Sequence, residues 1–229
     1  WKTASMYAKA MPAELKETKD GAEISYVYRL FDTGENIPGN ECRVTYGIRK
    51  DGALTIHMEY EADEKIKTHE MPEFGMLLRI PEQYDKVTYY GYGPEENYWD
   101  RRQGSRLGKF HFSVKENLSE YLAPQESGGR SGVREAVIED ENGYGLRISA
   151  EEMDFSALPY TPHELENARH LYELPDSEYT VLRPSLHQMG VGGDDSWLSK
   201  PHPQYRMEQP GKYEFTFTIK GGKKLETDK

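Results

Sequence analysis

The stretch ALTIHMEYEA, residues 53–62, alternates apolar and polar side chains with a period of two. Successive side chains of a β-strand point to opposite faces of a sheet, so this pattern predicts a strand with one face on a core and the other in water. Similar alternation recurs along the chain. The apolar sets are Leu54, Ile56, Met58 and Tyr60; Ile24, Tyr26, Tyr28 and Leu30; Phe110, Phe112 and Val114; Tyr144, Leu146 and Ile148; and Tyr213, Phe215, Phe217 and Ile219. We therefore expect an all-β protein.

Turn signals separate the alternating segments and predict hairpins with antiparallel pairing. Asp51-Gly52, Asn142-Gly143 and Pro210-Gly211 each come directly before such a segment, and these residue types favour tight turns. One stretch differs, because Thr161 can cap a helix that has Pro162 at its first position and acidic residues in its first turn. We predict one short helix over Pro162–Arg169.

Composition and charge narrow the class of protein. The chain has 229 residues, of which 12% are aromatic, and these include 17 tyrosines, a content that favours half-buried strands. We expect one domain over residues 1–220 and a polar tail over residues 221–229. A net charge of −11 argues against nucleic acid or an anionic membrane as a partner. Cys42 is the only cysteine, so no internal disulfide and no cysteine-based zinc site can form, and its apolar setting predicts a buried thiol.

The most distinctive segment is HQMGVGGDDSW, residues 187–197. Glycine reaches backbone conformations that other residues avoid, so we expect a positive φ at one or more of the loop-shaping residues Gly190, Gly192 and Gly193. The loop can present Trp197 to a sugar, because an indole face covers the apolar side of a sugar ring while Asp194 and Asp195 accept hydrogen bonds from hydroxyl groups. The alternative is a tight turn in which the aspartates cap backbone amides and Trp197 is part of the core.

Other segments that superficially match reactive sites favour structural roles. Glu95, Glu96, Asp100, Arg101 and Arg102 crowd one loop; paired acids can cleave glycosides, but adjacent arginines favour structural ion pairs. The glycine-rich runs do not open an apolar helix after a parallel-type strand, so a dinucleotide-binding loop is rejected. His163-Glu164 lacks the second histidine of the HExxH zinc motif, so no metal site is predicted.

Four segments, in order, resemble the small-chain-like C-terminal domain of glycoside hydrolase family 2 β-galactosidases. They are YYGYGPEENYWDRRQGSRLGKF from Tyr89, EYLAPQESGGRSGVREAVI from Glu120, FSALPYTPHELENARHLYEL from Phe155, and HQMGVGGDDSW followed by Pro203, Tyr205 and Arg206. Together they cover roughly residues 89–219. Residues 1–4 also resemble a WK-x-A stretch inside this domain. The family segment that precedes that stretch has no match here, so we expect a domain truncated at its N-terminal side.

The resemblance implies a galactose-mutarotase-like antiparallel supersandwich beside the TIM barrel of a retaining β-galactosidase that hydrolyses terminal β-D-galactosides. A retaining mechanism needs two carboxylic acids about 5 Å apart. Neither catalytic motif of the family is present, so we expect no catalytic residue in this chain and no activity from it alone. The motif match identifies Trp197 as the aromatic residue that lines the rim of the active site. One departure is Ser185, where the closing signature often has aspartate.

The implied partners are a galactoside sugar, the other domains of the parent enzyme and, through that enzyme, a homo-oligomer. No cofactor is expected in this chain, and any Mg or Na that the parent needs would be bound by its other domains. The compartment, cytoplasmic or periplasmic, stays open. Two other function classes also stay open: a stand-alone carbohydrate-binding module, and a structural or oligomer-forming domain in which Trp197 only packs.

Overall fold

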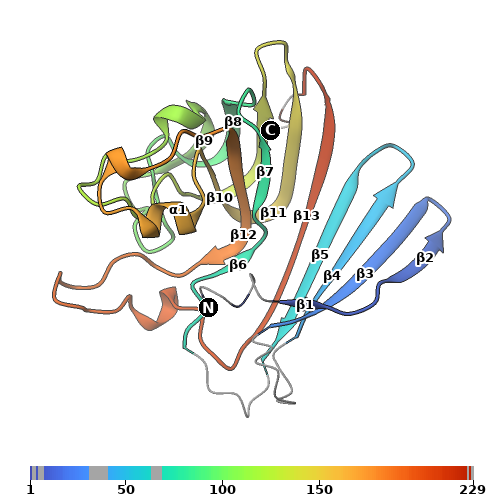
Figure 1. Cartoon of the computed structure of the whole chain (residues 1–229), viewed down its shortest axis with the longest axis horizontal. Coiled ribbons are helices and arrows are strands. Elements are labelled where there is room, and N and C mark those ends of the chain that lie inside the picture. The colour runs from blue at the N-terminus through green and yellow to red at the C-terminus, as the bar shows by residue number, and fades with distance from the viewer. Residues whose placement is uncertain (2–3, 5–7, 31–40, 63–68, 226, 228–229) are drawn as a thin grey trace. The chain divides into compact units, whose positions relative to one another are not determined.

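The computed structural model (Figure 1) describes the chain except for residues 2–3, 5–7, 31–40, 63–68, 226 and 228–229. The described residues fall into two compact units. The first comprises Trp1–Gly75 and Leu186–Lys220, and the second comprises Met76–Ser185 and Gly221–Lys229. The single domain predicted over residues 1–220 stays a prediction.

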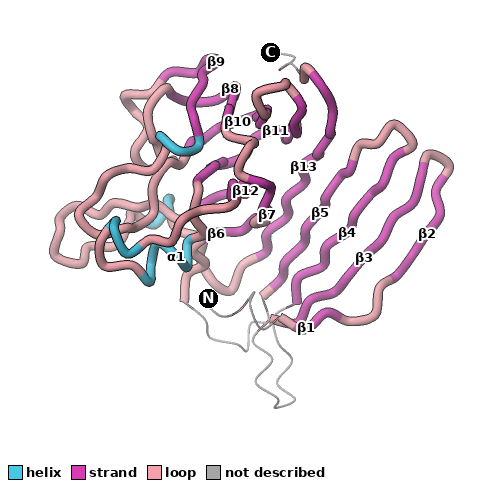
Figure 2. The backbone as a smooth tube through the Cα atoms, turned by 45° about the horizontal axis from the view of Figure 1, so that its top comes forward, coloured by secondary structure: helices cyan, strands magenta, loops and turns pink. Residues whose placement is uncertain are grey.

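The first unit is built on an antiparallel sheet. Its strands are β1 (Lys9–Ala10), β2 (Glu14–Thr18), β3 (Gly21–Arg29), β4 (Glu41–Arg49), β5 (Leu54–Glu61), β6 (Glu73–Gly75) and most of β13 (Lys212–Lys223). Both β1 and β2 pair with β3, which is followed across the sheet by β4, β5 and β13. Figure 2 shows β2, β3, β4 and β5 side by side. The predicted turn at Asp51-Gly52 joins β4 to β5, and Gly52 adopts a φ of 80° there.

The core of the first unit lies on the face that the alternation predicts. Met58 on β5 is opposite Phe215 on β13, and Ile56 is opposite Phe217. All four side chains are buried, and so is Tyr60. On the other face of the same strands, His57 Nδ1 and Thr216 Oγ1 are 2.8 Å apart. Burial of each large apolar side chain stabilises the fold by about 1.5–3 kcal/mol, so the side chains of this strand pair contribute substantially to the stability of the first unit.

The single cysteine lies within this apolar environment. Cys42 on β4 is a buried free thiol, as predicted. Burial disfavours the charged thiolate and raises the pKa of Cys42 to about 11. The thiol is therefore a small apolar core group and is poorly reactive as a nucleophile at neutral pH.

The second unit is also built from antiparallel strands. Its strands are β7 (Leu78–Pro81), β8 (Lys86–Gly93), β9 (Arg106–Ser113), β10 (Arg130–Glu139), β11 (Tyr144–Leu158) and most of β12 (Tyr179–Gln188). They pair in the order β9, β8, β10, β11, β12 and β7. Gly143, with a φ of 75°, makes the predicted turn between β10 and β11. The last residues of β13, up to Lys223, also belong here, so the predicted polar tail begins as strand.

Helix is scarce, as predicted. The α-helix among the described residues is α1 (Pro162–Asn167), which ends two residues before the predicted boundary at Arg169. Three single-turn 3-10 segments accompany it, η1 (Val114–Glu116), η2 (Leu171–Glu173) and η3 (Pro203–Tyr205). The predicted fold class, antiparallel β with one short helix, is confirmed. In the part of the chain that the structure describes, no helix is long and apolar enough to cross a membrane.

Candidate functional site

The loop between β12 and β13 holds the residues singled out from the sequence, and backbone hydrogen bonds fix its base in the first unit. The amide of Met189 donates to the carbonyl of Pro72 at 2.8 Å, and the amide of Gly190 donates to the carbonyl of Tyr205 at 2.8 Å. These two bonds bring the start of the loop next to its end. We call residues 190–205 the tryptophan loop.

The tryptophan loop presents apolar side chains to solvent. The exposed fraction is 86% for Trp197 and 97% for Leu198. The carboxylate of Asp195 accepts a hydrogen bond from the backbone amide of Trp197, with a distance of 2.7 Å from Oδ1 to the nitrogen. This short turn sets the backbone direction at Trp197. Asp195 therefore caps a backbone amide, as the alternative interpretation predicted. Trp197 does not pack into a core within this chain, so the other half of that interpretation does not hold.

Asp194 makes a different contact from its neighbour. Its Oδ1 lies 2.7 Å from Nε2 of His202, on the returning side of the tryptophan loop. The returning side is fixed in turn by Lys200, whose Nζ lies 2.8 Å from Oε1 of Glu70. The hydrogen bond from Lys200 lowers the pKa of Glu70. The two predicted aspartates thus lie in one loop but make different contacts: Asp195 binds a backbone amide, and Asp194 binds the side chain of His202.

The glycines of the loop are not used for the positive φ that the sequence predicted. None of Gly190, Gly192 and Gly193 has a positive φ, so that prediction is wrong. The left-handed residue here is Leu198, with a φ of 73°. Gly193 is instead required by a close approach, because a Cβ at this position would lie 2.1 Å from the carbonyl oxygen of Ser199. The sequence showed that glycine was needed without showing which of its two properties was used.

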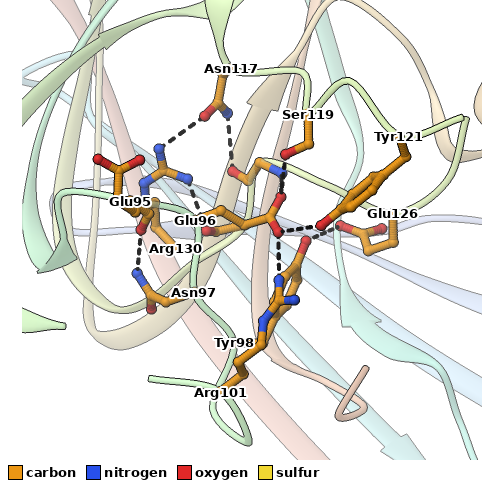
Figure 3. Close-up of polar contacts among 12 residues, drawn as sticks. Glu95, Glu96, Asn97, Tyr98, Arg101, Asn117, Ser119, Tyr121, Glu126 and Arg130 are labelled. Atoms are coloured by element: carbon orange, nitrogen blue, oxygen red, sulfur yellow. Dashed lines mark hydrogen bonds and ion pairs between the residues drawn. The ribbon is translucent and has the colours of Figure 1, made fainter. Parts of the chain in front are cut away.

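The acid-rich loop that follows β8 is a structural hub of the second unit. Glu96 accepts hydrogen bonds from Arg101 Nη2 at 2.5 Å, Ser119 Oγ at 2.9 Å and Tyr121 Oη at 3.0 Å, as Figure 3 shows. Its Oε2 also accepts from the amide of Gly128 at 2.6 Å. A carboxylate with four donors is held in one position, and this supports the ion-pair interpretation over a catalytic one.

Sequence reasoning missed a buried polar network beside this hub. Asn117 is buried, and its Nδ2 donates to the carbonyls of Gly128 and Ala157, both at 3.0 Å. Its Oδ1 accepts from Nη2 of the buried Arg130 at 3.0 Å (Figure 3). Every one of these contacts joins residues that are well separated in the chain. No local pattern could have indicated them.

Two further positions noted in the sequence have structural partners. Glu164 completes a capping box with Thr161 at the start of α1, so its carboxylate is used locally. Ser185, the departure from the family signature, is buried, and its Oγ donates to the carbonyl of Asp154 at 3.4 Å. Across the described residues, no group of three or more histidine, cysteine, aspartate and glutamate side chains is arranged to hold a metal ion.

Comparison with known proteins identifies the family. The sequence profile of the beta galactosidase small chain family matches residues 1–219. A β-galactosidase of Halalkalibacterium halodurans is 38% identical over 96% of this chain and 22% of its own length. One from Priestia megaterium is 43% identical over 78% of this chain and 17% of its length, and one from Streptococcus thermophilus is 36% identical over 96% and 21%.

The chain spans about a fifth of the length of the curated relatives that it matches. The chain belongs to the beta galactosidase small chain family. Among solved structures, a galactose mutarotase related enzyme of Lactobacillus acidophilus is similar over 94% of this chain and 73% of that chain, with 12% identity and a TM-score of 0.42. That structural likeness is weak, and the family assignment rests on the sequence relatives.

Proposed function

We propose that this chain is the small-chain domain of a retaining β-galactosidase that hydrolyses terminal β-D-galactosides. In this proposal the two catalytic carboxylates lie outside the chain, on the TIM barrel of the same enzyme. Family membership and β-galactosidase relatives at 36–43% identity support this assignment. The domain's own part is to lend Trp197 to the rim of the active site, where the indole stacks on the sugar.

The observation that carries the role of Trp197 is its exposure. The Trp197 residue leaves 86% of its surface in solvent, so its indole is free to stack on a ligand or a partner. A sugar ring is a suitable ligand, because its C–H side is apolar and flat. Covering about 50–80 Å² of ring at about 25 cal/mol per Å² is worth roughly 1–2 kcal/mol, which is about five- to thirtyfold in affinity.

The carboxylates of the tryptophan loop complement this stacking. Asp194 lies close to Trp197 in the chain, is 80% exposed at its side chain and has lone pairs beyond the one that faces His202. Sugar hydroxyl groups donate to such oxygens. We assign Asp194 and Asp195 a supporting role, with Trp197 as the main contact.

The test is the kinetics of Trp197→Ala in the enzyme that contains this chain. We expect KM for a galactoside to rise about five- to thirtyfold while kcat holds steady, because uniform binding lost from ground and transition states changes KM alone. Trp197→Phe keeps a stacking ring and should recover most of the loss.

A matched control is Tyr172→Ala in η2, an aromatic residue of the second unit that is also largely exposed. Its removal should leave both constants unchanged. If Trp197→Ala gives a folded enzyme with unaltered KM and kcat/KM, Trp197 does not contact sugar and the proposed role is withdrawn.

A further inference from the structure

The side-chain contact between Asp194 and His202 crosses the tryptophan loop from one side to the other. Asp194 lies on the outgoing side, three residues before Trp197, and His202 lies on the returning side, just before η3. The 2.7 Å separation between Asp194 Oδ1 and His202 Nε2 is that of a charge-assisted hydrogen bond. The contact therefore closes a ring of chain that contains Trp197.

The His202 side of this ring is fixed to the rest of the first unit. Lys200 is bound to Glu70. Arg206 Nε donates to the carbonyl of Pro201 at 2.5 Å, and the amide of Tyr205 donates to the carbonyl of His202 at 2.8 Å. The imidazole therefore projects from a segment that is held on both of its flanks, and it can act as an anchor.

The Asp194 side of the ring leads directly to the stacking residue. Asp195 binds the amide of Trp197, so the backbone from residue 194 to residue 197 forms one turn. When Asp194 is held by His202, this turn is attached to the anchored segment at its start. Without that contact, the start of the turn would be held only through residues 190–193. Three of these residues are glycines, and glycine has more backbone freedom than any other residue type.

We propose that Asp194 and His202 are positioning residues for Trp197 and so help to set the affinity of the enzyme for its sugar. This inference rests on the proposed function of Trp197. An exposed aromatic side chain binds more tightly when its loop is already ordered, because less conformational entropy is lost on binding. Neither side chain touches a reacting atom, so the chemical step is left alone. His202, which has no sugar contact of its own in this proposal, acts on binding only through the indole.

The size of the effect follows from the exposure of the pair. The side chains are 52% exposed at His202 and 80% exposed at Asp194, and ion pairs in water contribute little. We therefore expect a smaller change than removal of the indole itself gives. His202→Ala should raise KM about two- to fivefold with kcat unchanged, which is the range of an exposed pair. His202→Gln, whose amide nitrogen can donate to Asp194, should recover part of the loss.

The control for a general effect of removing an exposed histidine is His170→Ala. His170 is 54% exposed at its side chain and lies 3.1 Å from Glu173, so it forms a similar exposed pair in the second unit. Its removal should leave KM unchanged. A rise in KM for His170→Ala equal to that for His202→Ala would overturn the proposal.

The decisive experiment is a double-mutant cycle in the complete enzyme with Trp197→Ala and His202→Ala. If His202 acts through the indole, it has nothing to position once Trp197 is absent, so the double variant should have the KM of Trp197→Ala alone. Equal factors for His202→Ala with and without Trp197 would sink the inference, because the histidine would then act independently.

The cycle also distinguishes the role of Trp197 in sugar binding from the positioning role of Asp194 and His202. A raised KM for Trp197→Ala together with an unchanged KM for His202→Ala overturns the positioning role and leaves the proposed function intact. An unchanged KM for Trp197→Ala overturns the proposed role of Trp197 in sugar binding, and the positioning role is lost with it. Asp194→Asn, which still accepts a hydrogen bond from His202, should lie nearer to the parent enzyme than Asp194→Ala does.

Discussion

The carboxylate of Glu96 accepts a 2.6 Å hydrogen bond from the backbone amide of Gly128, thirty-two residues further along the chain. The same carboxylate binds Ser119 and Tyr121, so one side chain fixes both ends of the segment over residues 119–128. Gly128 is at a position that no other residue fits well, since its φ is 69° and a Cβ would lie 2.6 Å from Nδ2 of Asn117. The long loops of the second unit are thus fixed by side chains in place of regular secondary structure.

Glu96→Ala should destabilise the protein more than any change at an exposed neighbouring acid. It leaves several partly buried donors without an acceptor, and each such donor costs about 1–3 kcal/mol when it is fully buried. We expect a loss of about 2–4 kcal/mol in the free energy of unfolding, measured by urea denaturation. The matched control is Glu95→Ala, at an exposed side chain, which should cost less than about 0.5 kcal/mol. Equal losses for the two variants would contradict the hub role.

Glu164 should make the stability of the protein depend on pH in the acid range. Burial opposes ionisation of Glu164, but hydrogen bonds from Tyr179 and Thr161 outweigh it and lower its pKa below the ordinary value of 4.5. A carboxyl group whose pKa is lower in the folded state stabilises the protein above its unfolded pKa, and this stabilisation is lost as the pH falls through the folded pKa.

Glu164→Gln removes this titration. We expect the variant to be less stable than the parent at neutral pH and to lose less stability as the pH falls below about 4.5, because it has no charge to lose. Unfolding free energies at neutral and acid pH would measure both effects. Parallel pH profiles for parent and variant would show that Glu164 does not contribute.

Leu198 has the left-handed conformation that costs a residue with a Cβ roughly 1–2 kcal/mol. Leu198→Gly should remove that strain, and the gain should offset the extra chain entropy of glycine in the unfolded state. Leu122→Gly is the matched control, because Leu122 is equally exposed at 97% and is not among the residues with positive φ. We expect Leu198→Gly to be more stable than Leu122→Gly by about 1–2 kcal/mol. A thermal unfolding series in which the two variants lose the same stability would refute the strain.

The isolated chain should not hydrolyse a chromogenic β-galactoside above background. Retaining hydrolysis needs a nucleophile and an acid about 5 Å apart, and Glu96, the most densely bonded acid described above, is held by four donors. Saturable turnover by a pure sample would show that this chain carries catalysis of its own.

Local patterns were enough to predict the strands β3, β5, β9, β11 and β13 and the start of the helix. The alternation around Met58 and Phe215 depends only on the period of a strand, and the start of α1 depends on Thr161 and Pro162, which are adjacent in the chain. The side-chain contacts of Glu96 and Asn117 could not be predicted in this way, because all but the one with Arg101 join residues 11 to 40 positions apart. Their geometry is set by how the strands pair, and a single sequence does not state that pairing.

The tryptophan loop was predicted in part. Its residue types indicated a glycine-shaped turn with capping aspartates, and the bond from Trp197 to Asp195 has that form. The exposure of Trp197 could not be decided, because a tryptophan side chain suits a core and a binding surface equally well. The contact between Asp194 and His202 was missed, since no short motif links an aspartate to a histidine eight residues later.

The pairing of β5 with β13 has a consequence for how the protein is made. His57 on β5 and Thr216 on β13 are 159 residues apart, so a ribosome has synthesised almost the whole chain before β5 can acquire this neighbour. During that time the nascent chain exposes the edge of β5 and the apolar side chains of Ile56 and Met58, which the finished sheet buries. Such an edge can pair with other chains. The rate of translation through the 159 residues between His57 and Thr216 therefore sets how long the nascent protein stays prone to aggregation.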